Sequence, residues 1–280
     1  MSSRLSAQEF LLTDSEFDRL RSIVRELTGI ALGDSKRELV YGRLARRLRK
    51  LNLSSFSEYC TLVEAGHGEE LQELTNAITT NLTSFFREKY HFQQLAAEAL
   101  PYVAQHRAAT RRVRMWSAGC STGEEAYSIA MVVREAHRHF AGWDVRLLAT
   151  DIDSKVVAAA AAGIYAAERL RDMDAQRVAR WFRPCAEGAH QYAVADDLRS
   201  LITFRQLNLL DPWPVKGPFD VIFCRNVTIY FDKDTQRQLF ERIAALQEPG
   251  AWLFIGHSEN LFNVSQCYKS VGRTVYRRAD

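Results

Sequence analysis

Polar side chains that could bind a nucleoside-like ligand follow four short apolar runs of this chain. They lie at residues 117–125, at Asp151, at Asn208 and Leu209, and at Arg225 and Asn226. If each run is a strand of an open α/β sheet, these side chains lie beyond the carboxyl ends of the strands, where such sheets bind ligands. The sequence therefore predicts one ligand site that is assembled from four strand ends.

A glycine loop follows the first of these runs. Gly119 would let the backbone approach a ligand closely, and Thr122 with Glu125 predicts a capping box at the start of the next helix. The amides of that helix terminus favour a carboxylate or a phosphate. Glu124, outside the capping box, could face a cation. A ligand that carries carboxylate, ammonium and sulfonium groups fits this mixture better than a pyrophosphate does.

The spacing argues against a nicotinamide dinucleotide. The loop is GxxxG rather than GxGxxG, and Asp151 lies 32 residues after Gly119 (151 − 119) rather than about 20. An acid at the end of the second strand still suits ribose hydroxyls. On its own, the loop fits a plain strand-to-helix turn equally well. The joint occurrence of four suitable strand ends is what favours cofactor binding.

The elements that position this site belong to the second part of the chain, because the first 80 residues indicate a small helical bundle. Thr13 and Glu16 form a capping box, helical spacing of apolar residues follows, and Gly29 ends that helix. Further helices are predicted at about 35–51, around 56–62 and around 71–78. We expect a helical domain over residues 1–80 and a second domain over 81–280.

From about residue 112, short apolar runs alternate with helical stretches. The predicted strands are 113–117, 145–150, 201–207, 219–224 and 251–255. This alternation is typical of a parallel sheet covered on both faces, so an α/β fold is predicted. Residues 268–271 and 274–277 have no helix between them and predict an antiparallel hairpin. Residues 165–200 are too long for a simple connection, and 191–195 alternates like a strand.

Composition and charge restrict the class of protein only mildly. The chain has 37 basic and 34 acidic residues among 280. A net charge of +3 is too small to indicate a polyanionic partner. The cysteines are scattered without a CxxC pair, so neither a disulfide framework nor a metal site is expected. No signal peptide opens the chain, and its longest nearly apolar run, 156–167, is shorter than the roughly 20 residues that span a bilayer. A cytoplasmic protein without membrane insertion is expected.

Four longer segments resemble the signature segments of the CheR family of chemotaxis receptor glutamate methyltransferases. They are NLTSFFR at 81–87, SAGCSTGEE at 117–125, FCRNVTIYFD at 223–232 and GHSEN at 256–260. The similarity extends over nearly the whole chain. It implies a Rossmann-like class I methyltransferase sheet, mostly parallel with an antiparallel C-terminal hairpin. It also implies a small N-terminal helical domain and an inserted β-subdomain at about 165–200.

The resemblance implies methyl transfer from S-adenosylmethionine to glutamate side chains of chemotaxis receptors. The products would be S-adenosylhomocysteine and the glutamate methyl esters used in sensory adaptation. The implied cofactor-binding residues are Asn81, Thr83, Arg87, Gly119, Glu124, Asp151, Asn208, Leu209, Arg225 and Asn226. Glu124 and Asp151 would hold the methionine and ribose parts of the cofactor, and Asn208 and Leu209 would flank the adenine.

The catalytic residues that the resemblance implies are Arg87 and Tyr230. A glutamate acceptor is already ionised near neutral pH, so no general base is needed, and positioning becomes the main task. We expect Arg87 to orient the incoming carboxylate and Tyr230 to lie beside the transferred methyl group. Thr228 and Ala126 depart from the family's frequent methionine and proline. Neither position supplies a group that the chemistry needs.

A basic segment at residues 36–50 is the candidate surface for docking a receptor. Its candidate docking residues are Lys36, Arg43, Arg46, Arg47 and Lys50. Without the resemblance, a solvated surface helix is the simpler interpretation. The family's glutamate-rich substrates favour docking of the cytoplasmic helical domain of chemotaxis receptors. Tyr41 is the only aromatic residue in this basic segment, and one aromatic side chain offers little surface for stacking on bases. No nucleic-acid partner is therefore expected.

Two other functions stay open as alternatives. One is a class I methyltransferase that acts on RNA or another protein, and the other is a non-catalytic cofactor-binding scaffold, which Arg87 and Tyr230 disfavour. Some family members grip a receptor peptide tether through a glycine-rich loop. Residues 183–190 contain only Gly188 among glycines, so tether-independent recognition is expected. By resemblance, we also expect a monomer that is recruited to receptor arrays. His257, Ser258 and Glu259 have the residue types of a hydrolytic triad, but sequence neighbours are not expected to converge.

Overall fold

The computed structural model describes residues 9–186 and 190–280, without the side chain of His137. Contacts divide the chain into two compact units, one that ends at Thr80 and one that spans Asn81–Asp280. Gly188, on which the expectation about the receptor tether depends, lies outside the described residues. That expectation stays a prediction.

The N-terminal unit is helical, as predicted. Its elements are α1 (Asp14–Thr28), the 3-10 turn η1 (Asp34–Lys36), α2 (Arg37–Leu51), α3 (Phe56–Glu64) and α4 (Gly68–Ile78). The predicted capping box is confirmed, since Glu16 N donates to Thr13 Oγ1 at 3.2 Å and Thr13 N donates to Glu16 Oε2 at 2.8 Å. Gly29, with φ +73°, ends α1 in the left-handed conformation. The buried side chains of Leu20, Leu44 and Leu48 belong to the core of this unit.

The larger unit alternates strands with helices. Its helices and helical turns are α5 (Lys89–Gln94), the π-helical turn η2 (Leu95–Ala99), α6 (Leu100–His106), α7 (Glu124–Glu135), α8 (His137–Phe140), α9 (Ser154–Ala162), η3 (Ala167–Leu170), α10 (Ala175–Trp181), α11 (Asp196–Arg199), η4 (Thr228–Tyr230) and α12 (Lys233–Ala245). Its strands are β1 (Arg112–Ala118), β2 (Asp144–Asp151), β3 (Ile164–Ala166), β4 (Phe182–Pro184), β5 (Gln191–Val194), β6 (Ile202–Gln206), β7 (Val221–Cys224), β8 (Trp252–Ile255), β9 (Tyr268–Gly272) and β10 (Val275–Arg278).

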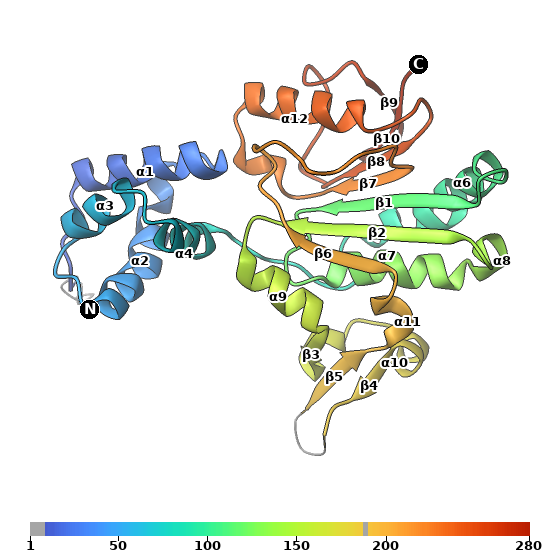
Figure 1. Ribbon diagram of the computed structural model, residues 1–280, viewed down its shortest axis with the longest axis horizontal. Helices are drawn as coiled ribbons and strands as arrows, with labels where there is room; N and C mark the ends of the chain where they lie inside the picture. Colours follow the sequence, from blue (N-terminus) through green and yellow to red (C-terminus); the bar gives the residue numbers. More distant parts are fainter. Residues whose placement is uncertain (1–8, 187–189) are drawn as a thin grey trace, which may run out of the picture. The chain divides into compact units, whose positions relative to one another are not determined.

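The main sheet of the described chain has the strand order β6-β2-β1-β7-β8-β10-β9 (Figure 1). β1 pairs in parallel with β2 and β7, and the parallel pairing continues from β2 to β6 and from β7 to β8. β10 is antiparallel to both of its neighbours. The predicted fold, a mostly parallel sheet with an antiparallel C-terminal hairpin, is confirmed.

Both faces of this sheet are buried, because alternate side chains of each central strand pack on opposite sides. Trp116, Ile222 and Leu253 share one core cluster with Leu239 and Phe240 of α12. Their sequence neighbours belong to a second cluster, which includes buried side chains of α7. Helices therefore cover both faces and leave the strand ends to carry the polar groups (Figure 1).

The insertion between β2 and β6 folds as a small antiparallel sheet in the order β3-β5-β4. β5 lies within the predicted 191–195 segment, whereas β3, β4 and α10 were not predicted from the sequence. Strands of three residues are too short for a period-2 pattern to stand out. In the described ranges, no helix is both long and apolar enough to cross a membrane.

Candidate active site

The carboxyl ends of β1, β2, β6 and β7 meet at one edge of the sheet, because these strands are parallel (Figure 1). Backbone hydrogen bonds continue past the strand ends and hold the loops together. Gly119 N donates to Thr150 O at 2.8 Å, and Leu207 N donates to Asp151 O at 2.9 Å. The loops that carry the predicted polar residues therefore start from a rigid common edge.

The glycine loop after β1 differs from the prediction in two respects. The N-cap of α7 is Gly123, with φ +94° and no side-chain capping bond, so the predicted Thr122–Glu125 capping box is wrong. The carboxylate of Glu125 instead accepts from Ser117 Oγ at 2.7 Å and from Arg225 Nη1 at 2.9 Å. Gly119 has φ +88°, and a Cβ there would overlap Val227, so loop packing already requires this glycine.

Glu124, the first residue of α7, has a cation against its carboxylate. The residue is fully buried, and its carboxylate forms an ion pair with Nη2 of Arg169. Thr122 Oγ1 donates to the same carboxylate at 2.6 Å. The structure thus places a buried anion beside the glycine loop, where an ammonium group of a ligand would be stabilised.

Asp151, at the end of β2, organises the loop as well as facing the site. Its two carboxylate oxygens accept from Ser121 N at 2.8 Å and from Asp153 N at 3.0 Å. Burial raises the pKa of this carboxyl group, against the opposing effect of these backbone amides. Each carboxylate oxygen has a second lone pair, so Asp151 can still accept from ribose hydroxyls.

The segment 81–88 connects several of these loops. Asn81 Nδ2 donates to Asp153 Oδ2 at 2.8 Å, and the Asn81 carbonyl accepts from Ser121 Oγ at 3.1 Å. The guanidinium of Arg87 donates to Leu82 O at 2.7 Å, and its side chain is half-buried. This segment therefore brings Asn81 and Arg87 to the same edge as Asp151 and the glycine loop.

Arg225, a predicted cofactor-binding residue, is buried among the loops of the site. Its side chain is only 2% exposed, and it donates from Nη2 to Arg87 O at 2.6 Å and from Nη1 to Glu125 at 2.9 Å. The same Nη2 lies 3.3 Å from Glu88 Oε2. Arg225 therefore fixes the backbone of the segment 81–88 against α7 and acts as a positioning residue.

Two titratable groups beside Arg225, Glu88 and His91, differ in charge at neutral pH because both of their pKa values are lowered. Burial opposes ionisation of Glu88, but Arg225 and a hydrogen bond with His257 outweigh it and lower the pKa of Glu88 to about 2. Burial also lowers the pKa of His91 to about 3, with Arg225 acting in the same direction. At neutral pH, Glu88 is consequently an anion and His91 a neutral ring, which donates to or accepts from Thr274 Oγ1 at 3.0 Å.

Glu259 orders the loop after β7, a role that the sequence did not predict. Its buried carboxylate accepts from the backbone N–H groups of Asn226, Val227, Thr228 and Gly256 at 2.5 to 3.1 Å. Thr228 Oγ1 adds a further bond at 2.7 Å, which a methionine at this position could not make. Glu259 thereby holds the loop after β7 in place. Its place in the GHSEN segment was the only available signal.

The remaining predicted ligand residues have local partners or stay open to a ligand. Asn208 accepts from Leu210 N at 3.1 Å, and the Leu209 side chain is buried, with its carbonyl bonded to Trp213 Nε1 at 3.2 Å. Thr83 and Tyr230 are half-buried, and within residues 9–186 and 190–280 no partner is found for either hydroxyl. Tyr230 ends the turn η4, directly after the loop that Glu259 holds.

His257 and Ser258 do form a hydrogen-bonded chain, but not with Glu259. Ser258 Oγ lies 3.0 Å from His257 Nε2, and His257 Nδ1 lies 2.9 Å from Glu88 Oε1. The expectation that the three sequence neighbours do not converge is confirmed, because Glu259 is occupied by backbone amides. The chain from Ser258 to Glu88 orients the exposed imidazole of His257.

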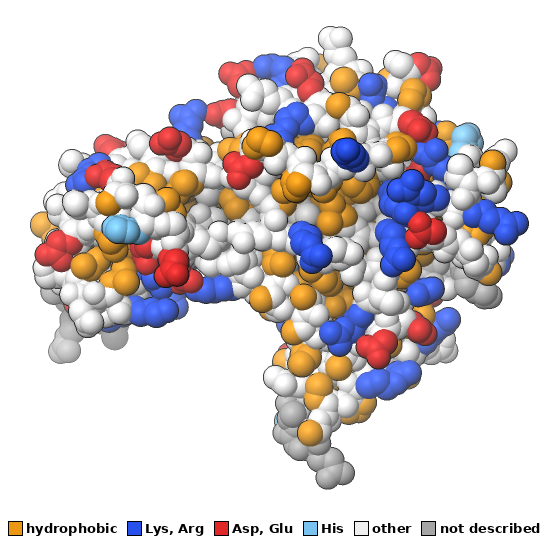
Figure 2. Space-filling view, viewed as in Figure 1, with side chains coloured by type: hydrophobic (Ala, Val, Ile, Leu, Met, Phe, Trp, Pro, Cys, Tyr) orange, Lys and Arg blue, Asp and Glu red, His pale blue; other side chains and the backbone are white. Residues whose placement is uncertain are grey.

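Two of the five candidate docking residues are partly buried by contacts with α4 and its C-terminal end. Arg43 donates to the carbonyls of Ile78 and Thr79, each at 2.7 Å, at the end of α4. Arg47 pairs with Glu70 and lies 2.7 Å from Glu73, and its side chain is only 12% exposed. Lys36, Arg46 and Lys50 are exposed. On the face shown in Figure 2, acidic and basic side chains are interspersed.

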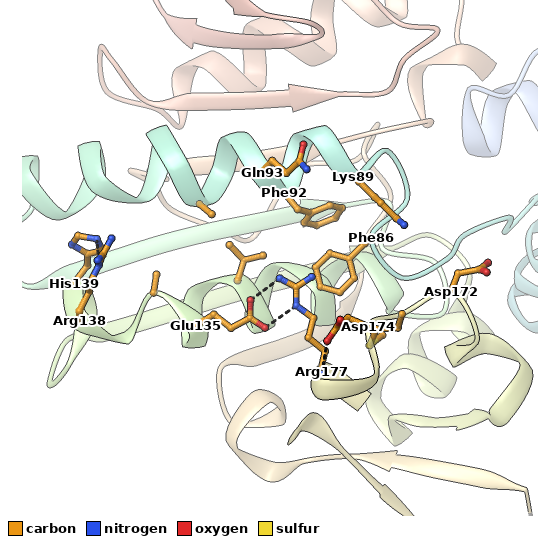
Figure 3. Close-up of a pocket in the computed structure, with 14 residues that line it drawn as sticks. Phe86, Lys89, Phe92, Gln93, Glu135, Arg138, His139, Asp172, Asp174 and Arg177 are labelled. Carbon is orange, nitrogen blue, oxygen red and sulfur yellow. Dashed lines mark hydrogen bonds and ion pairs between the residues drawn. The ribbon is translucent and has the colours of Figure 1, made fainter. Parts of the chain in front are cut away.

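A cavity of about 620 Å³ lies away from the glycine loop. Figure 3 shows that Arg177 and Glu135, two of the residues that line it, point toward one another, and they form hydrogen bonds of 2.9 and 2.8 Å. Arg177 also lies over the Phe86 ring, 4.4 Å from its centroid. Glu135 is the last residue of α7, whereas the glycine loop precedes the first residue of that helix. The cavity is therefore not the candidate cofactor site.

The groups gathered at the sheet edge fit an S-adenosyl cofactor. A buried carboxylate that already holds a cation suits an ammonium group, the acid at the end of β2 suits ribose hydroxyls, and Asn81 and Asn208 supply amides. In the part of the chain that the structure describes, no cluster of three or more metal-ligating side chains is found.

The strand order, the antiparallel last strand and the polar groups at the strand ends define a class I S-adenosylmethionine-dependent methyltransferase fold. Two family models match this chain: "CheR methyltransferase, SAM binding domain" over residues 81–277 and "CheR methyltransferase, all-alpha domain" over residues 15–79. The chain belongs to the CheR methyltransferase family, as the sequence motifs predicted.

Several relatives match this chain over nearly their full length. Chemotaxis protein methyltransferase 2 of Pseudomonas aeruginosa is 47% identical over 274 residues, which cover 97% of this chain and 96% of the relative. Chemotaxis protein methyltransferase of Escherichia coli is 42% identical over 274 residues, which cover 96% and 92%. A probable chemotaxis protein methyltransferase of Rhizobium etli is 43% identical over 252 residues, which cover 89% and 94%.

Proposed function

We propose that this protein transfers a methyl group from S-adenosylmethionine to glutamate side chains of chemotaxis receptors. The observation that carries the proposal is the convergence of Arg87, Glu124, Asp151 and the Tyr230 loop at one sheet edge. Relatives that cover nearly the whole chain are named chemotaxis protein methyltransferases, which supports receptors as the substrate class. We propose that the protein acts in the cytoplasm as a monomer and is recruited to receptor arrays.

The residues of this chain act by positioning rather than by proton transfer. The cofactor supplies a methyl group that its sulfonium has already activated. Arg87 pairs with the carboxylate of the acceptor glutamate and directs it, while Arg225 holds the Arg87 backbone. Arg87 also donates to Leu82 O, and we propose that its attraction for the acceptor carboxylate is only moderate. A moderate attraction is useful because tight ground-state binding would not speed the reaction.

Tyr230 and the loop before it complete the site. Glu259 fixes the loop 226–228. The backbone of Tyr230, two residues further on, is therefore held in a defined position, and its side chain is half-buried. We propose that the ring covers the reacting methyl group and excludes water, which would otherwise solvate the acceptor carboxylate. Glu124 and Asp151 hold the amino-acid and ribose parts of the cofactor, and Asn208 and Leu209 flank the adenine.

The proposed function is tested by incubating the protein with methyl-labelled S-adenosylmethionine and candidate receptors. Label should enter the receptor and leave as methanol under mild alkali, because methyl esters are base-labile. A receptor with glutamines in place of its candidate glutamates is the matched negative control. Label that is stable to alkali, or that enters RNA instead of receptor, would contradict glutamate esterification.

The exposed cations of α2 and its N-terminal turn are proposed to dock the acidic receptor helix. We expect the triple variant Lys36→Glu, Arg46→Glu, Lys50→Glu to raise KM for receptor at least about tenfold at low salt, because three attractive contacts become repulsive. The affinity for S-adenosylhomocysteine should not change. The effect should weaken as ionic strength rises. Initial rates at several receptor concentrations measure it.

A second triple variant controls for net charge. Arg146, Lys216 and Lys269 are exposed residues of the larger unit, and their replacement by glutamate makes the same change in total charge. We expect its KM for receptor to stay within about twofold of wild type. Equal losses in both triple variants would mean that total charge, rather than the docking face, governs binding.

A further inference from the structure

Arg169 lies at the cofactor loop although it belongs to the inserted subdomain. It is part of the turn η3, directly after β3. Its Nη2 forms an ion pair with Glu124 and lies 3.4 Å from Thr122 Oγ1. Neither the sequence motifs nor their spacing pointed to this residue, which is 45 positions away from Glu124 in the chain.

The segment that carries Arg169 is anchored on the same loop by a second contact. Tyr165 Oη, on β3, donates to Thr122 O at 2.6 Å. Its ring is buried and packs edge-on against Phe85, with the centroids 5.0 Å apart. Because β3 is fixed to the loop at Tyr165, the short turn that follows delivers the Arg169 side chain to Glu124.

The guanidinium of Arg169 retains capacity for another partner. A guanidinium has five N–H donors, and the acceptors found for it in the described chain, Glu124 and Thr122, both contact Nη2. The side chain keeps 42% of its surface exposed, in contrast to the fully buried Glu124. The Nε and Nη1 donors therefore remain for a ligand, and a carboxylate is the group that a guanidinium edge binds best.

We propose that Arg169 binds the carboxylate of the cofactor's methionine moiety, beside Glu124, which binds the ammonium group on the same carbon. This inference rests on the proposed function and extends it. The α-amino acid end of the cofactor carries opposite charges close together, and the Glu124–Arg169 pair presents the complementary charges side by side. In the free protein each charge balances the other, so the buried Glu124 is not left uncompensated.

The test compares two cofactors that differ only in this carboxylate. Calorimetry measures the binding of S-adenosylmethionine and of decarboxylated S-adenosylmethionine to the wild type and to Arg169→Gln. We expect the variant to bind S-adenosylmethionine at least about tenfold more weakly, since it loses a charge-assisted hydrogen bond. It should bind the decarboxylated compound as the wild type does. Arg169→Lys, which keeps the charge but loses the planar edge, should fall between the two.

Arg171→Gln is the matched control. Arg171 follows in the same segment, is 75% exposed and pairs only loosely with Glu168, at 3.7 Å. It should bind both compounds as the wild type does, and thermal melting should show all variants folded. Equal weakening of both compounds in Arg169→Gln would overturn the proposal in favour of a purely structural role.

Two further results would also overturn it. Unchanged binding would leave Arg169 without a part in the site, and tighter binding would mean that Arg169 blocks Glu124 in the free protein. Failure of the proposed function is distinguishable from these results. If the protein does not use this cofactor, the wild type itself would bind neither S-adenosylmethionine nor S-adenosylhomocysteine. If it methylates an acceptor other than receptor glutamates, binding of both compounds would persist and only the receptor assay would fail.

Discussion

Arg87→Ala is expected to lower the rate of receptor methylation by about 100-fold or more, the loss typical of removing one group that stabilises or orients the reacting charge. Affinity for S-adenosylhomocysteine should fall much less, because Glu124, Asp151 and the glycine loop are untouched. The variant should fold normally, since the half-buried Arg87 side chain donates only to the nearby carbonyl of Leu82 in the described chain. Single-turnover methylation and calorimetry together separate the two effects.

Two companion variants sharpen this test. Arg87→Lys keeps the charge without the planar fork and should lose less activity than Arg87→Ala. Lys89→Ala removes an exposed cation two residues away and should leave the rate unchanged. An Arg87→Ala protein that binds cofactor and turns over at the wild-type rate would remove Arg87 from the mechanism.

Arg225→Ala is expected to have the largest effect on stability, about 3–5 kcal/mol, because it leaves the buried carboxyl group of Glu125 without its cation. Burial raises the pKa of Glu125 already, against the opposing effect of Arg225, and the substitution should raise it further. A carboxyl group with a raised pKa binds more protons in the folded state than in the unfolded state. Stability is therefore lost as pH rises above the unfolded pKa.

The stability deficit of Arg225→Ala should accordingly be smaller near pH 5 than near pH 8. His91 acts in the same direction. Its depressed pKa costs the wild type stability as pH falls below about 6.5, and Arg225 contributes to that depression. Urea unfolding of both proteins at the two pH values measures the difference. Adding Glu125→Gln should restore part of the stability and flatten the pH dependence, and a deficit that is equal at both pH values would contradict the account.

Local patterns predicted the fold well because they depend on neighbouring residues. The Thr13–Glu16 capping box needs only side chains three positions apart, and the central strands β7 and β8 are continuous apolar runs. The three-residue strand β3 gives no such pattern. The predicted Thr122–Glu125 capping box is wrong for a non-local reason. The carboxylate of Glu125 accepts a hydrogen bond from Arg225, which lies 100 positions further along the chain.

The site was predictable as a set of residues but not as a set of contacts. Position at a strand end identified Glu124, Asp151 and Arg225, yet nothing local indicates that Arg225 turns inward while Asp151 bonds to loop amides. The basic helix α2 shows the same limit. Composition could not reveal that Arg43 and Arg47 are engaged by α4, since their partners lie more than twenty positions away.

Glu259, which orders one loop of the site, lies later in the chain than the residues proposed for binding and catalysis. The residues proposed for cofactor binding and catalysis all precede residue 231 in the chain, whereas the carboxylate that orders the backbone of 226–228 follows β8. A fragment cut between α12 and β8 would carry every one of those side chains and still lack the carboxylate that orders this loop. During synthesis on the ribosome, the loop 226–228 can therefore be ordered only after the segment that follows β8 and carries Glu259 has been made.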